Sequence, residues 1–106
     1  MNLKLIRQKD INNLAKATAA VSGFKSHDIV FNNKHMFANW AAIGMYVARE
    51  LGANLDDAAT VFNRAPATCY VAVRKIKNRM KAGDEAVIKA VDDVREEVLG
   101  RRDGRD

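Results

Sequence analysis

Residues 45–76, MYVARELGANLDDAATVFNRAPATCYVAVRKI, contain the end of one long helix, a short helix, a tight turn and a second long helix. Gly52 ends the first helix, because glycine readily adopts the left-handed conformation that follows a helix C-terminus. Asn54 is a good N-cap for the short helix. Pro66 is tolerated in the first turn of a helix, which we expect to reach Lys81. A short helix joined to a longer one by a tight turn is typical of a helix-turn-helix.

Further helical segments precede and follow this region. After a short lead-in at residues 2–7, the expected helices cover residues 11–21, 26–31, 35–51, 55–62 and 66–81, and a last helix starts after Asp84. The helix over residues 35–51 carries an apolar stripe at three-and-four spacing, in which Gly44 indicates close packing against another helix. Asp10 can cap the first helix, and Ile29 and Phe31 are the expected anchors of the second. We therefore expect an all-α fold of five or six helices.

Composition favours one small helical domain. The chain has 106 residues, of which 48% are hydrophobic and 7% aromatic, enough for a single core built largely on alanine. We expect one domain over residues 1–106, with its core at about residues 6–98 and a charged tail at residues 99–106. Cys69 is the single cysteine, so the chain has no internal disulfide. No segment is typical of a signal peptide or a membrane span, and we expect a cytoplasmic, nucleoid-associated protein.

Charge is distributed unevenly along the chain, whose formal net charge is +5. Residues 1–82 hold 13 Lys and Arg against 5 Asp and Glu, whereas residues 83–106 hold 5 against 8. A basic body with a mildly acidic end suits a polyanionic partner. The alternative interpretation is that these charges only keep the protein dispersed in water.

The helix over residues 66–81 separates into two faces at 100° per residue. Its core face consists of Cys69, Ala72, Val73, Ile76 and Met80. Its outer face consists of Ala67, Val71, Arg74, Asn78 and Lys81, flanked by Lys75 and, from the turn, by Arg64. Small residues at the helix start allow a close approach to a DNA groove, and the cations beyond them can bind phosphates. A solvated amphipathic helix is the alternative interpretation of this face.

The same region resembles the C-terminal DNA-binding domain (domain IV) of DnaA, the bacterial replication initiator. The residues of GMYVARELGANLDDAATVFNRAPATCYVAVRKI that match the family pattern are Met45, Tyr46, Ala48, Arg49, Glu50, Leu51, Leu55, Phe62, Arg64, Thr68, Ala72, Arg74, Lys75 and Ile76. The resemblance extends over about residues 6–98. It implies a monomeric, Trp repressor-like helix-turn-helix domain. In that family the second helix enters the major groove of an origin box, and a basic loop reaches the adjacent minor groove.

The sequence departs from the family pattern in the turn, at the start of the second helix and near the basic loop, and some of these positions are base-reading in the family. The departures are Asn63 for two glycines, Ala65 and Pro66 for Asp-His, Ala67 for the first of two threonines and Asn39 for an arginine. A good bidentate base contact contributes roughly 1–3 kcal/mol of discrimination, so we expect weaker selectivity for the usual DnaA box. Phosphate-type contacts are expected from Arg64, Thr68, Arg74 and Lys75. The complete set of candidate DNA-binding residues is Lys34, His35, Asn39, Arg64, Ala67, Thr68, Val71, Arg74, Lys75, Asn78 and Lys81.

The first functional hypothesis is a small protein that binds duplex DNA, including origin-like sites, and modulates replication initiation or transcription. No G-x-x-x-x-G-K-[ST] phosphate loop is present, so we expect a free-standing domain that is not an enzyme and has no ATPase activity. The alternative is a protein-interaction module that acts on DnaA or another replication protein. The loss of Asp-His favours this alternative, whereas the retained Arg64, Arg74 and Lys75 favour the first hypothesis. We expect no cofactor, metal, membrane or small-molecule substrate, and His27 and His35 lack a metal-ligand spacing.

Overall fold

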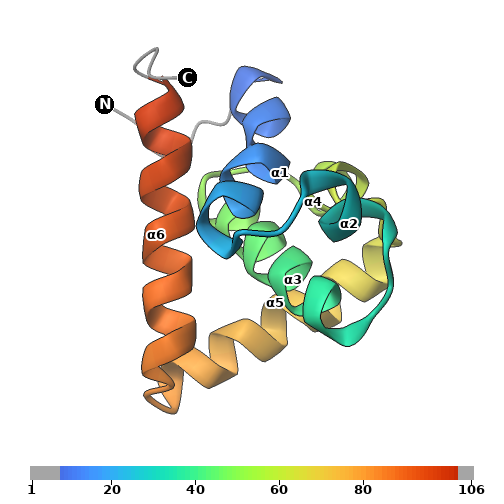
Figure 1. The fold of residues 1–106 in the computed structure, drawn as a ribbon. Coiled ribbons are helices and arrows are strands. Elements are labelled where there is room, and N and C mark those ends of the chain that lie inside the picture. Colours follow the sequence, from blue (N-terminus) through green and yellow to red (C-terminus); the bar gives the residue numbers. More distant parts are fainter. Residues whose placement is uncertain (1–7, 103–106) are drawn as a thin grey trace.

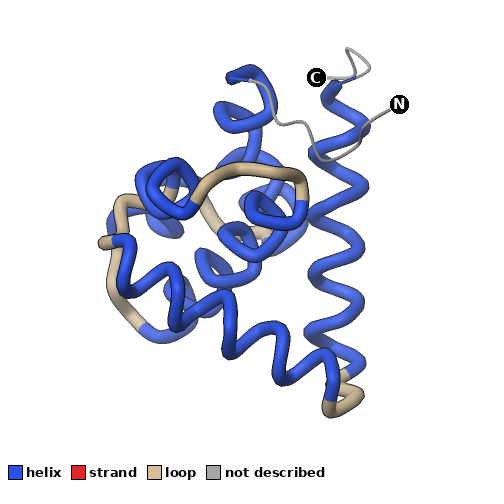
Figure 2. Tube along the Cα trace, turned by 180° about the vertical axis from the view of Figure 1, so that it is seen from behind, coloured by secondary structure: helices blue, strands red, loops and turns tan. Residues whose placement is uncertain are grey.

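The computed structural model describes residues 8–102 of the chain. These residues form six α-helices joined by short loops (Figure 1). They are α1 (Gln8–Ser22), α2 (Ser26–Phe31), α3 (His35–Glu50), α4 (Leu55–Val61), α5 (Pro66–Lys81) and α6 (Glu85–Arg102). Figure 2 shows helices joined by loops, with no strand in these residues, so the predicted all-α fold is confirmed. The predicted lead-in at residues 2–7 and the end of the predicted tail, residues 103–106, lie outside the described residues.

α3 is the central helix, because it packs against each of the other five. Its buried residues are Ala41, Ala42, Ile43, Gly44, Met45, Val47 and Ala48. Gly44 faces Thr18 of α1 and Phe62 at the end of α4. A Cβ atom at position 44 would lie 2.8 Å from Oγ1 of Thr18 and 2.8 Å from Cε2 of Phe62, and closer still to Cζ of that ring. The predicted close-packing role of Gly44 is therefore confirmed.

Local capping explains the borders of α4 and α5. Oδ1 of Asn54 accepts a hydrogen bond from the backbone N–H of Asp57 at 2.8 Å, which confirms the predicted N-cap. Asn63 has a φ of 53°, a left-handed conformation that asparagine tolerates better than most residues. Pro66 is the first residue of α5, where its missing N–H removes no intrahelical bond. The predicted helix-turn-helix is thus formed by α4 and α5.

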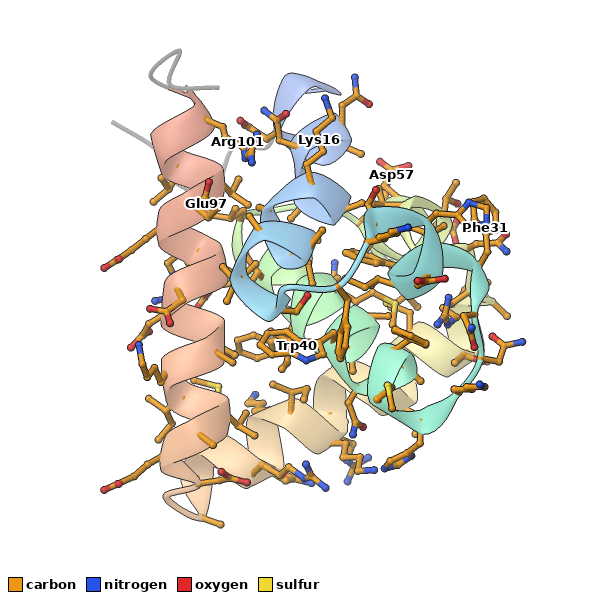
Figure 3. The ribbon with its side chains drawn as sticks, in the orientation of Figure 1. Lys16, Phe31, Trp40, Asp57, Glu97 and Arg101 are labelled. Atoms are coloured by element: carbon orange, nitrogen blue, oxygen red, sulfur yellow. The ribbon has the colours of Figure 1, made fainter. Side chains whose placement is uncertain are left out.

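Two predictions about the N-terminal helices are wrong. α1 begins at Gln8 rather than at residue 11, so Asp10 lies inside the first turn and is fully buried instead of capping the helix. Phe31 is 58% exposed, and Figure 3 shows it at the outer edge of the molecule, whereas Ile29 is fully buried. Residues 29 and 31 lie about 200° apart around a helix, so one short helix cannot turn both toward the same core.

α6 packs along α1 and α3 and completes the core (Figure 1). Oδ1 of Asp84 accepts a hydrogen bond from the backbone N–H of Val87 at 3.3 Å, in agreement with the predicted start. Val94, in the middle of the buried stripe of α6, has no exposed surface. The helix continues to Arg102, so the described part of the predicted tail is helical. Among the described helices, none has both the length and the apolar character needed to cross a bilayer.

Candidate nucleic-acid interface

α5 has one buried and one exposed face, as its sequence predicts. Cys69 and Ile76 are buried, and Ala72, Val73 and Met80 are partly buried against the core. The residues of the opposite face are all exposed: Ala67, Val71, Arg74, Asn78 and Lys81. α5 packs against α3 and α4, and in Figure 1 it runs along the lower edge of the molecule to the foot of α6. One side of α5 is therefore open to solvent along its whole length.

The exposed side of α5 is strongly basic. The helix has no acidic residue, and its five basic residues are all exposed: Arg74, Lys75, Lys77, Arg79 and Lys81. No carboxylate in residues 8–102 forms an ion pair with any of them. By contrast, Arg95 of α6 pairs with Glu50 of α3 at 2.7 Å and with Asp92 at 2.8 Å. The positive charge of α5 is thus not compensated by neighbouring side chains, which favours attraction of a polyanion.

Two shallow hollows lie on either side of a ridge on α5. Tyr70, Arg74 and Asn78 line both hollows. The other residues of the first hollow are Val71, Lys75, Arg79 and Ala82, and those of the second are Arg49, Leu55, Val73, Lys77 and Lys81. Three cations that line these hollows are not among the candidates predicted from the sequence: Arg49, Lys77 and Arg79. Helical spacing could have found Lys77, at the edge of the exposed arc, whereas Arg49 belongs to α3 and reaches this hollow only through tertiary packing.

Arg64 lies in the turn between α4 and α5, with its guanidinium group half-buried against backbone carbonyls. Nη1 donates hydrogen bonds to the carbonyl oxygens of Phe62 and, at 2.6 Å, of Val30. Nη2 donates to the carbonyl oxygens of Ile29, at 3.2 Å, and of Asn32, at 3.4 Å. Burial lowers the pKa of this guanidinium from its ordinary value. The sequence predicts a phosphate contact for Arg64, but in the structure both Nη groups face the protein's own backbone.

The loop between α2 and α3 forms a second basic segment. Lys34 and His35 are exposed, and Asn39 is half-buried on α3. Figures 1 and 2 both show this loop beside the first turns of α5, where Thr68 is also exposed. The hydrogen bonds of Arg64 join the turn before α5 to the end of α2. The structure therefore places this loop, with the exposed Lys34, beside the first turns of α5.

Comparisons with known proteins agree with the resemblance seen in the residues. No family model and no solved structure matches the chain. Over 93 residues, 86% of the chain, it is 31% identical to the chromosomal replication initiator protein DnaA of Thermotoga petrophila (strain ATCC BAA-488 / DSM 13995 / JCM 10881 / RKU-1). The matched part spans 21% of the length of that protein. The chain is thus similar to a fragment of DnaA, consistent with its C-terminal domain.

Proposed function

We propose that this chain binds duplex DNA through the exposed face of α5 and that it modulates replication initiation or transcription. One observation carries the proposal: the exposed cations of a single helix have no acidic partner in the described residues 8–102. The similarity to DnaA supports DNA binding at a coarse level. In this proposal the chain contributes contacts to DNA and no catalytic step.

The two halves of α5 have different roles in the proposed complex. Ala67 and Val71 are small, so the first two turns can approach the edges of bases in the major groove. Arg74, Lys75 and Lys81 follow them and bind phosphates on either side of the groove. Each phosphate contact lowers the slope of log K against log salt concentration by about 0.9, because counterions are released from the duplex. Binding is therefore expected to weaken steeply as salt increases.

The first test is fluorescence-anisotropy binding to three labelled duplexes: a DnaA box, a scrambled box and a random pool. Each is measured at low and at near-physiological salt. Selective binding to the box at the higher salt supports a role at origins. Weak, salt-dependent binding to all three supports contacts to DNA phosphates without recognition of the box sequence. Absence of binding to all three at low salt excludes the proposal.

Reversing two charges on α5 tests where the DNA binds. Arg74→Glu together with Lys75→Glu is expected to weaken binding roughly 100-fold or more, because two phosphate contacts are replaced by repulsion. Circular dichroism should be unchanged, since both side chains are exposed. Anisotropy titrations measure the change in affinity.

The matched control reverses Lys16 of α1 and Lys89 of α6, both exposed. Figure 3 shows Lys16 at the opposite end of the molecule from α5. This control changes the net charge by the same amount as the α5 variant and is expected to reduce affinity only slightly. Equal losses in the two variants would mean that total charge, rather than the face of α5, drives binding.

A protein-interaction module is the second candidate function, and exposed apolar residues of the same face favour it. Val71 is 67% exposed and Tyr70 is 49% exposed. Adjacent apolar side chains that are exposed to solvent are typical of interaction surfaces. Binding to purified DnaA in a titration, together with no binding to any duplex, would establish this candidate in place of the first.

A further inference from the structure

We propose that Arg64 is a positioning residue, which holds the loop between α2 and α3 against the start of α5 so that both segments meet one duplex. This inference rests on the proposed DNA binding. It assigns Arg64 no phosphate contact of its own, in contrast to the role that the sequence predicts.

The four acceptors of Arg64 belong to two helix ends. The carbonyls of Ile29, Val30 and Asn32 lie at the end of α2, and that of Phe62 follows the last residue of α4. Carbonyls at a helix C-terminus lack intrahelical partners and carry partial negative charge. One guanidinium therefore donates to carbonyls at the ends of both helices, although these ends lie 30 residues apart in the sequence.

This arrangement competes with a phosphate contact. A phosphate would have to draw the Nη groups of Arg64 away from four carbonyl oxygens in a half-buried site. Each acceptor left without a donor there is unfavourable. The cations of α5 have no such competing partners in residues 8–102, so they can bind phosphates without breaking internal bonds.

Hydrogen bonds within the loop fix its basic residue relative to the backbone groups that Arg64 holds. Three residues separate α2 from α3. Within them, the backbone N–H of Lys34 donates to Oδ1 of Asn32 at 2.9 Å. The carbonyl of Lys34 in turn accepts a bond from the backbone N–H of Ala38, inside α3, at 3.0 Å. Lys34 and His35 are thus held at a defined place relative to Arg64, and through it relative to α5.

The salt dependence of DNA binding distinguishes positioning from direct contact. Arg74→Ala removes a phosphate contact, so it should make the slope of log K against log salt shallower by about 0.9. Arg64→Lys keeps a positive charge, but one ammonium group cannot bond to four carbonyls. If Arg64 binds phosphate, Arg64→Lys should keep most of the affinity. If Arg64 is a positioning residue, Arg64→Lys should lose as much affinity as Arg64→Gln.

A double-mutant cycle with Lys34 tests the coupling. Lys34→Ala should weaken DNA binding when Arg64 is present. It should have little further effect in the Arg64→Gln background, because the loop is then no longer held against α5. Additive effects of the two substitutions would overturn the inference, as would full retention of affinity in Arg64→Lys.

Hydrogen exchange separates this inference from the proposed function. In Arg64→Gln, the hydrogen-bonded amides of Asn32 and Lys34 should exchange faster, while those of the buried part of α3 stay protected. Unchanged exchange in the loop would overturn the inference even if the protein binds DNA. If the unaltered chain binds no duplex, the proposed function fails, and the role assigned here to Arg64 in DNA binding fails with it. Faster exchange of the loop amides in Arg64→Gln would then show only that Arg64 stabilises the loop.

Discussion

Gly44 lies where α1, α3 and the end of α4 meet, and the space at this position admits only a hydrogen atom. Gly44→Ala would press a methyl group into Phe62 and Thr18. We expect it to lower the free energy of unfolding by about 1–3 kcal/mol, although alanine favours helix formation. Urea denaturation measures this change.

A second substitution identifies the cause of that loss. Phe62→Leu removes the ring atoms that the new methyl group would meet. Gly44→Ala should therefore be less destabilising in the Phe62→Leu background than in the unaltered chain. Equal losses in the two backgrounds would mean that the ring is not responsible.

At the scale of elements, the short helix α4 depends on its cap. Oδ1 of Asn54 is bonded to the N–H of Asp57, and both α3 and α5 pack against α4. Asn54→Ala should lower the free energy of unfolding by about 1 kcal/mol, because an N–H of the first turn loses its partner. Asn54→Ser retains an acceptor and should lose much less in the same thermal or urea experiment. A difference of zero between the two variants would argue against the cap.

At the scale of the whole molecule, α6 stabilises the fold while α5 meets the solvent. Val94 is fully buried where α6 packs along α1 and α3. Val94→Ala should lower the free energy of unfolding by about 2 kcal/mol through lost burial and a residual cavity. DNA affinity well below the melting temperature should stay the same, because Val94 is buried in the core and has no surface that DNA could contact. A parallel loss of affinity would mean that α6 takes part in binding.

The distribution of charge also differs between α5, which is exposed to solvent, and α6, which stabilises the fold. The basic residues of α5 stand in solvent without acidic partners in the described residues, whereas basic residues of α6 pair with carboxylates nearby. Lys89 bonds to Asp93 one turn away at 2.9 Å, and hydrogen bonding to this carboxylate raises the pKa of the lysine. The net charge of the chain therefore understates the positive field of the face that would meet DNA.

The sequence by itself determined the all-α fold, the borders of α2 and α5, and the two faces of α5. It also determined the caps at Asn54 and Asp84. These features depend on residues within about one helical turn of each other, through periodicity, capping and the conformational preferences of glycine and proline. The exposed candidate residues of α5 could be predicted for the same reason.

Only the tertiary structure decided that Asp10 is buried, that Phe31 stands in solvent and that Arg49 reaches the second hollow beside α5. It also decided the environment of Arg64, which looks like a surface cation in the sequence. Its acceptors at Val30 and Ile29 are 34 and 35 residues away along the chain. No local pattern encodes such a distance, because it is set by how the helices pack around α3.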